Sequence, residues 1–249
     1  MNIHAPVDNL RGDYSAMAAD WTVPQADFYS DEDQETWRLL AKRQASLASK
    51  FACAEFLRGL ATLGIGDTIP DFAAVNARLE PMTGWRIVGV PGLIPDAVFY
   101  DHLAHRRFPV TVWIRKRSEL DYLVEPDLFH DFFGHVPLLT DPVFANYMQE
   151  YGKRGVEAGP NVHLLARLYW YTVEFGLIRT RDGLKAYGAG ILSSAAETRH
   201  AIEGEGVHRL PFDAHRVMNS PYEIDKLQTT YFVLDDFSQL FEAAQTRVT

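Results

Sequence analysis

The sequence predicts a mainly α-helical protein of the α+β class, a single helical domain with a few short β-strands. Helix start signals and helical spacing of apolar residues recur along the chain, whereas β-branched runs are few and short. The 249 residues are 47% hydrophobic and 23% charged, which is typical of a globular protein. No stretch rich in proline or glycine separates two halves of the chain, so we expect one domain.

The N-terminal residues 1–29 read as an irregular segment, and a single catalytic domain is expected over residues 30–249. Ser30 followed by three acidic residues predicts a helix start, because the hydroxyl caps free N–H groups and carboxylates favour the positive end of the helix. Apolar residues at helical spacing extend this first helix over 31–63, where Gly64 and Gly66 stop it.

The remaining elements follow from shorter signals. Asp96 is a candidate helix cap, Asp141-Pro142 begins another helix that runs to about Tyr151, and Ser194 with Glu197 has capping-box spacing. The other expected elements are strands at 85–90, 110–114 and 229–234, helices at 162–178 and 235–245, and a turn or strand pair at 185–193. Helices therefore dominate.

Composition excludes several classes of protein. The net charge of −9 and the shortness of the densest basic run, 115–117, argue against nucleic-acid binding. The longest run without charged residues, 186–196, is too short to span a membrane, and the N-terminus resembles no secretory signal. The only cysteine, Cys53, cannot form an internal disulfide and reads as a core residue, which favours a cytoplasmic location.

The segment EPDLFHDFFGHVPLL (125–139) holds two histidines, His130 and His135, in an apolar setting. Such a pair is a natural ligand set for a divalent metal. Five residues along an ideal α-helix turn through about 140°, so the two side chains need local unwinding, a π-bulge or a helix end to meet. Gly134 and Pro137 mark where such a break is expected. The alternative is two core histidines bonded to backbone groups.

A third ligand is expected from Glu174, which lies in an apolar helical stretch. A buried carboxylate must be protonated, ion-paired or bound to a metal. Salt bridges to Arg167 or Arg179 are the alternatives. Two histidines and one carboxylate suit non-haem Fe(II) and leave open coordination positions, although zinc is also chemically compatible.

Three segments in order carry a family resemblance: EPDLFHDFFGHVPLL (125–139), YWYTVEFGL (169–177) and KAYGAGILSS (185–194). The chain resembles the pterin-dependent aromatic amino acid hydroxylases over roughly residues 80–240, in a form most similar to their bacterial phenylalanine-specific members. The resemblance implies their helical catalytic fold, ferrous iron, and a tetrahydropterin co-substrate. The implied reaction is a monooxygenase step that converts L-phenylalanine to L-tyrosine with O2.

The resemblance also implies roles for individual residues. The iron ligands are His130, His135 and Glu174, which make up the catalytic centre. Substrate binding falls to Arg115 at the carboxylate, Ser193 at the same end, and Pro126 and Trp170 at the ring. The pterin contacts are Phe99, which stacks on the pterin ring, with Leu93, Ile94, Asp96 and Asp131. Asp131 stands where many members have glutamate, so its shorter side chain is expected to reach the pterin only through a water.

Other functions are open at this stage. The same chemistry on tryptophan, or at the meta position of phenylalanine, differs only in pocket shape. A zinc hydrolase would use the same ligands, but the histidine spacing and the adjacent Asp131 differ from the H-E-x-x-H pattern. A non-enzymatic domain that binds an amino acid or a metal is a further alternative. Residues 235–249 show no sustained heptad, so we expect a monomer.

Overall fold

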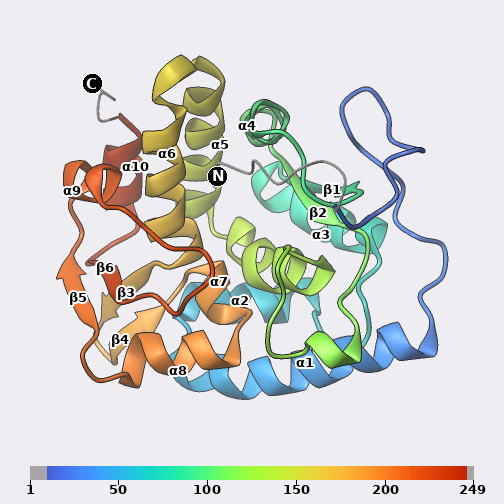
Figure 1. The fold of residues 1–249 in the computed structure, drawn as a ribbon, viewed down its shortest axis with the longest axis horizontal. Coiled ribbons are helices and arrows are strands. Elements are labelled where there is room, and N and C mark those ends of the chain that lie inside the picture. The colour runs from blue at the N-terminus through green and yellow to red at the C-terminus, as the bar shows by residue number, and fades with distance from the viewer. Residues whose placement is uncertain (1–9, 246–249) are drawn as a thin grey trace.

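The computed structural model describes residues 10–245, in which helices predominate and strands are short (Figure 1). The main helices are α1 (Asp31–Phe51), α2 (Ala54–Leu63), α3 (Phe72–Thr83), α4 (Asp96–Ala104), α5 (Pro142–Glu157), α6 (Val162–Tyr169), α7 (Ala189–Leu192), α8 (Ala195–Glu203), α9 (Ala214–Asn219) and α10 (Ser238–Gln245). Shorter helical turns are η2 (Arg117–Glu119), η3 (His130–His135), η4 (Val136–Thr140), η5 (Gly159–Asn161) and η6 (Trp170–Glu174). This architecture confirms the predicted fold class.

The strands form two small sheets. In one, β1 (Arg86–Val90) pairs in parallel with β2 (Arg107–Thr111), with Ile87 opposite Phe108. The other has the order β4-β3-β6-β5, in which β3 pairs antiparallel with β4 and parallel with β6, and β6 pairs in parallel with β5. Its strands are β3 (Leu177–Thr180), β4 (Gly183–Ala186), β5 (His208–Pro211) and β6 (Thr230–Leu234).

The predicted first helix over 31–63 is wrong in one respect, because it is broken into α1 and α2. Ala52 and Cys53 are extended, and the Cys53 N–H donates to the Ala186 carbonyl at the end of β4, with an N···O distance of 2.9 Å. Pairing with a distant strand therefore overrides the helical pattern of the sequence. Cys53 is fully buried, as predicted.

Several other boundaries also differ from the predictions. The helix expected over 162–178 ends at Glu174, because Leu177 and Ile178 pair with β6. Asp96 is the first residue of α4 and Pro95 occupies the cap position. The segment 185–193 contains the end of β4 and the short helix α7, and β2 begins three residues before the predicted strand. The helix from Asp141-Pro142 continues past Tyr151 to Glu157, and α3, β5 and α9 were not predicted at all.

The centre of the molecule is an aromatic core beneath η3. Phe132 packs edge-on against Trp37 of α1, and Phe133 packs against Phe56 of α2. Phe129 stacks on Phe133, and all five rings are at most 2% exposed. Figure 1 shows α1 running along one side of the molecule with η3 above it. The segment that carries both histidines is therefore fixed on a tightly packed base.

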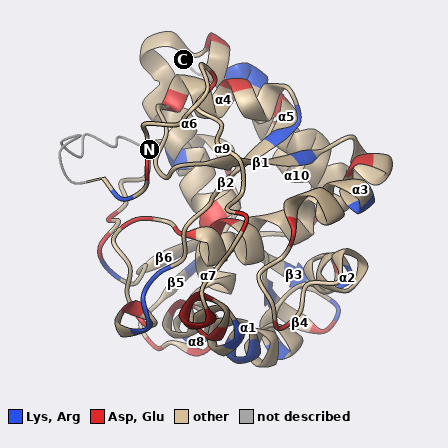
Figure 2. Cartoon of the chain, turned by 90° about the vertical axis from the view of Figure 1, so that its right-hand side faces the viewer, with Lys and Arg blue, Asp and Glu red and all other residues tan. Residues whose placement is uncertain are grey.

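The surface carries charge of both signs. Figure 2 shows basic and acidic residues interspersed along the helices and loops. Within residues 10–245, no helix combines the length and the apolar character that crossing a lipid bilayer requires.

Candidate active site

The two histidines lie at the ends of η3, a π-helical turn over His130–His135. In a π-helix the hydrogen bond joins residues five apart, so positions that diverge on an α-helix come to the same side. The imidazole centroids are 5.2 Å apart. A Cβ at Gly134 would lie only 3.0 Å from the Ala189 carbonyl oxygen and Cβ, so the glycine allows η3 to approach α7 closely. The π-bulge is thus the one of the three expected devices that the fold uses.

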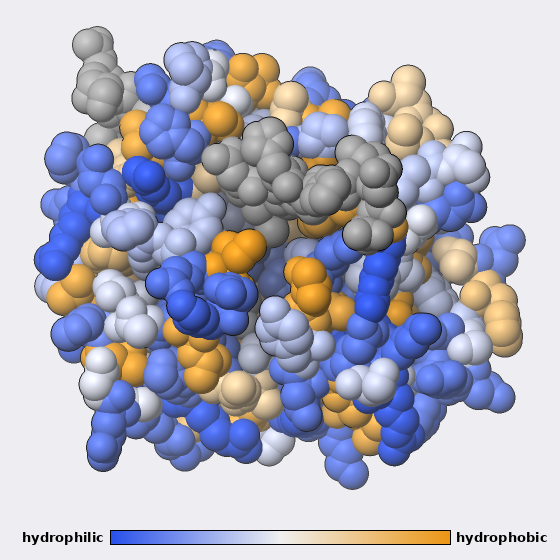
Figure 3. Space-filling view, in the orientation of Figure 1, coloured by the Kyte–Doolittle hydropathy of each residue, from blue (hydrophilic) through white to orange (hydrophobic). Residues whose placement is uncertain are grey.

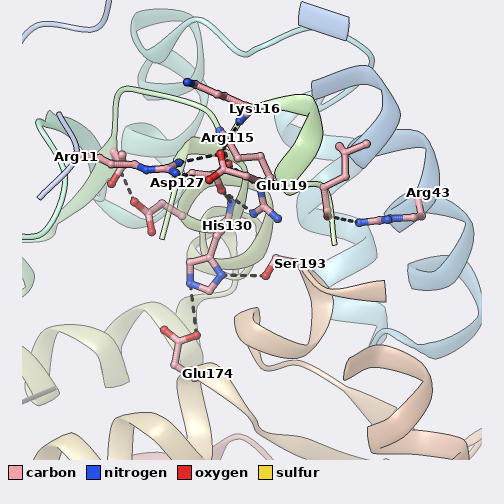
Figure 4. Close-up of polar contacts among 12 residues, drawn as sticks. Arg11, Arg43, Arg115, Lys116, Glu119, Asp127, His130, Glu174 and Ser193 are labelled. Atoms are coloured by element: carbon pink, nitrogen blue, oxygen red, sulfur yellow. Dashed lines mark hydrogen bonds and ion pairs between the residues drawn. The ribbon is translucent and has the colours of Figure 1, made fainter. Parts of the chain in front are cut away.

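Glu174 is delivered by a second π-helical turn, η6, at the end of α6. Its Oε1 lies 3.1 Å from His135 Nε2, and its Oε2 lies 3.5 Å from His130 Nε2 (Figure 4). The arginines considered as alternative partners are engaged elsewhere, since Arg167 donates to the Met218 carbonyl and Arg179 pairs with Asp235. The buried carboxylate therefore faces the two histidines.

The electrostatics of this cluster favour an anionic carboxylate. Burial alone would raise the pKa of Glu174, but the imidazoles of His135 and His130 outweigh it and hold this pKa well below its usual range. One ionised oxygen donor set then faces two nitrogen donors in a site that is largely closed to solvent.

The geometry fits one divalent metal ion. The candidate ligand atoms of His130, His135 and Glu174 all lie within 4.8 Å of one another. Two ligands about 2.1 Å from one ion and at right angles to each other are about 3 Å apart, close to the separations seen here. Two imidazoles with one carboxylate form the facial set that non-haem Fe(II) accepts. The residues present thus fit iron.

Ser193 lies behind one of these ligands. Its hydroxyl oxygen is 2.9 Å from His130 Nδ1, which directs His130 Nε2 toward the metal position (Figure 4). Ser193 is 5% exposed and does not line the cavity. Its predicted contact with the substrate carboxylate remains a prediction, and the contact present in the structure is with the histidine.

We expect Ser193→Ala to weaken metal binding about 10- to 100-fold, because the imidazole of His130 loses the partner that fixes its orientation. Titration of metal-free protein with Co²⁺ measures the change. Ser194→Ala is a matched control, since Ser194 caps α8 and its loss affects the helix rather than the ligands. Equal metal affinity in Ser193→Ala and the unaltered protein would contradict this role.

Arg115 and Asp127 form a buried ion pair beside the metal position (Figure 4). The Nε and Nη2 groups of Arg115 donate to the two carboxylate oxygens of Asp127, each at 2.8 Å. This bidentate contact uses two of the five N–H groups of the guanidinium and leaves the others for a ligand. Arg115 does not line the cavity, and its contact with a substrate carboxylate remains a prediction.

Asp127 is a structural residue of the site that the sequence reading missed. Besides Arg115, its carboxylate accepts the backbone N–H of His130 at 3.0 Å, so one side chain joins the arginine to a metal ligand. Burial raises the pKa of Asp127, but the Arg115 guanidinium outweighs it, and the net effect lowers this pKa below its usual value. An acid three residues before a helical N–H is the spacing of a helix cap, and that signal was available in the sequence.

A cavity opens onto the metal position. Figure 3 shows one face of the molecule hollowed near its centre, with apolar side chains on either side. The predicted residues that line the cavity are Leu93, Ile94, Asp96, Phe99, Pro126, His130, Asp131, His135, Trp170 and Glu174. Aromatic rings that the sequence reading did not single out also line it, namely Tyr100, Phe108, Tyr151, Tyr169 and Tyr222. The structure thus brings most of the predicted site together around one aromatic cavity.

The predicted pterin residues lie on one side of this cavity. Phe99 contacts Tyr169 edge-on at a centroid distance of 5.6 Å, and Tyr169 in turn stacks on His135. Asp131 accepts the backbone N–H of Thr111 on β2 at 2.8 Å, and burial raises the pKa of its carboxyl. These contacts tie the predicted cofactor side directly to a metal ligand.

A mainly helical fold with two histidines and a carboxylate at the base of an aromatic cavity defines the class of non-haem, metal-dependent oxygenases. The family model for biopterin-dependent aromatic amino acid hydroxylases matches residues 11–248. The chain belongs to this family.

The individual relatives are more specific. The chain is 54% identical to the phenylalanine-4-hydroxylase of Mesorhizobium japonicum, over 95% of this chain and 87% of the relative. It is 55% identical to that of Chromobacterium violaceum, over 91% of this chain and 77% of the relative. A crystal structure of the C. violaceum enzyme with oxidised Fe(III) superposes with a TM-score of 0.90 at 55% identity, covering 92% of this chain and 85% of the other.

Proposed function

We propose that this protein is an iron- and tetrahydropterin-dependent monooxygenase that hydroxylates L-phenylalanine to L-tyrosine with O2. The observation that carries the proposal is the convergence of His130, His135 and Glu174 at an aromatic cavity, in a chain more than half identical to phenylalanine-4-hydroxylases. Structures of the C. violaceum relative hold iron with phenylalanine, or iron(III) with 7,8-dihydrobiopterin, which supports the same ligands here.

The chain's own side chains would hold and protect the reacting groups. His130, His135 and Glu174 hold the metal on one side and leave coordination positions open toward the cavity. A bound ferrous ion together with a reduced pterin supplies the electrons that activate dioxygen. The aromatic lining of the cavity excludes water, which keeps the reaction on the organic substrate.

Orientation of the substrate falls to the two ends of the cavity. Arg115 binds the amino acid carboxylate with the N–H groups that Asp127 does not use, and Ser193 supports the same end. Pro126 and Trp170 flank the substrate ring. Phe99, Leu93, Ile94, Asp96 and Asp131 receive the pterin. Holding both partners in place supplies much of the rate enhancement expected of such an enzyme.

The test is product analysis with each of the three aromatic amino acids. We expect tyrosine from phenylalanine only when both ferrous iron and a tetrahydropterin are supplied, and none from chelator-treated protein. Faster turnover of tryptophan, or meta-tyrosine as the product, would replace the proposed substrate or position. Amide hydrolysis by the zinc-loaded protein, without pterin oxidation, would overturn the oxygenase assignment.

We also propose that the oxidant is O2, that the protein is a monomer and that it acts in the cytoplasm. The single buried cysteine supports a reducing compartment. The lack of a sustained heptad in residues 235–249 supports the monomer. Oxygen consumption and size-exclusion chromatography with light scattering measure the first two directly.

A further inference from the structure

Trp170 forms a wall of the cavity and is held from outside the cavity by a buried glutamine. Its indole is 8% exposed and lines the cavity together with the metal ligands. The indole N–H donates to Gln228 Oε1 at 2.9 Å. Gln228 itself is 5% exposed and does not line the cavity. It therefore acts on the cavity through the tryptophan.

Every polar group of Gln228 has a partner. Its Nε2 donates to the Glu223 and Lys226 carbonyls at 2.8 and 3.0 Å, and its backbone N–H donates to Glu197 Oε1 at 3.2 Å. Its carbonyl oxygen lies 3.0 Å from His200 Nε2. Because an indole nitrogen only donates and backbone carbonyls only accept, these partners fix which end of the amide faces the tryptophan.

The same amide shapes the segment that covers the other face of the indole. Tyr222 stacks on Trp170 with centroids 4.4 Å apart and an angle of 19° between the rings, and it lines the cavity as well. Tyr222 immediately precedes Glu223, whose carbonyl is held by Gln228. One side chain thus fixes both the indole edge and the segment 222–228 that carries the stacked ring.

We propose that Gln228 is a positioning residue that sets substrate selectivity by fixing the Trp170–Tyr222 wall of the ring site. This inference rests on the proposed function and names a determinant of its specificity. A wall held at both its edge and its face keeps one shape, so a ring larger than that of phenylalanine is excluded. When the glutamine bonds are lost, the indole and Tyr222 can turn, and the site admits larger rings while binding phenylalanine less well.

The test compares Gln228→Met and Gln228→Glu with a matched control in the iron-loaded protein. Methionine keeps the length but removes every side-chain hydrogen bond, whereas glutamate keeps an acceptor for Trp170 and loses both donors to the segment 222–228. Gln25→Met is the control, because the Gln25 amide also bonds backbone groups, those of Pro70 and Phe72, at a site away from the cavity.

For Gln228→Met we expect the KM for phenylalanine, and its Kd by calorimetry, to rise about tenfold, the order that corresponds to one lost buried hydrogen bond. The preference for phenylalanine over tryptophan should fall by a similar factor, with kcat changed less than about threefold and iron content unchanged. Gln228→Glu should give a smaller change in the same direction, and Gln25→Met none. A merely structural residue would lower the melting temperature without this split between KM and kcat.

An unchanged KM and an unchanged substrate preference in Gln228→Met would overturn the proposal, as would the same changes in Gln25→Met. If Gln228→Met shows no cooperative melting transition, Gln228→Glu decides, and an unaltered KM in that variant counts against the proposal. Lack of tyrosine formation by the unaltered protein would instead refute the proposed function, so the two failures are distinguishable.

Discussion

Replacement of Glu174 by glutamine is expected to remove most of the bound iron and to lower tyrosine formation by at least about two orders of magnitude. The side chain keeps its size and position but loses the negative charge that faces His130 and His135. Two neutral imidazoles alone bind a divalent ion far less well than the complete facial set. Metal analysis of the purified variant after incubation with Fe²⁺ measures the loss.

The control for Glu174→Gln is the same substitution at an exposed position. Glu203 pairs with Lys50 on the surface and touches no ligand, so Glu203→Gln should retain both iron and activity. Full iron occupancy in Glu174→Gln would remove this residue from the ligand set and leave the site with two histidines only.

Asp127→Asn is expected to cost about 3–5 kcal/mol of the free energy of unfolding. The asparagine keeps an oxygen for the His130 N–H, but it leaves the 7%-exposed Arg115 guanidinium without a counter-charge. Urea unfolding measures the loss. The same Glu203→Gln variant breaks an exposed ion pair and should cost less than about 1 kcal/mol. A cost below that of the surface pair would show that the buried pair contributes nothing to stability.

The same ion pair has a pH dependence of known sign. Burial opposes the ionised form of Asp127, but Arg115 outweighs it, so the folded-state pKa lies below the unfolded value. Its contribution to stability is therefore complete above the unfolded pKa of about 3.9 and disappears as the pH falls through the folded value. Asp127→Asn should accordingly flatten the acid limb of a stability–pH profile.

The chemistry of the site could be predicted from the sequence further than its geometry could. His130, His135 and Glu174 were recognisable because imidazoles and a carboxylate in apolar surroundings need a partner, and a family resemblance supported them. Their separation could not be reduced to one conformation, because an α-turn and a π-turn differ only by what packs around them. The close contact of Gly134 with α7 belongs to that packing.

Long-range contacts explain what the sequence reading missed. The break at Ala52 and Cys53 depends on pairing with Ala186, more than 130 residues away in the chain. Gln228 reads as an ordinary polar loop residue, and only the fold places its amide against Trp170. Local patterns report propensity, whereas these features arise from partners that no local pattern contains.

The two wide helical turns have a consequence for the tolerance of the chain to length changes. Each residue advances an α-helix by about 100°, so deleting one residue between His130 and His135, or in the turn that ends at Glu174, would swing a donor atom away from the others without altering a single ligand. Substitutions at neighbouring positions leave that phase intact. Indels in these two short stretches should therefore be far more damaging than point changes, and a deletion scan across 131–134 would reveal it as a sharp minimum in metal content.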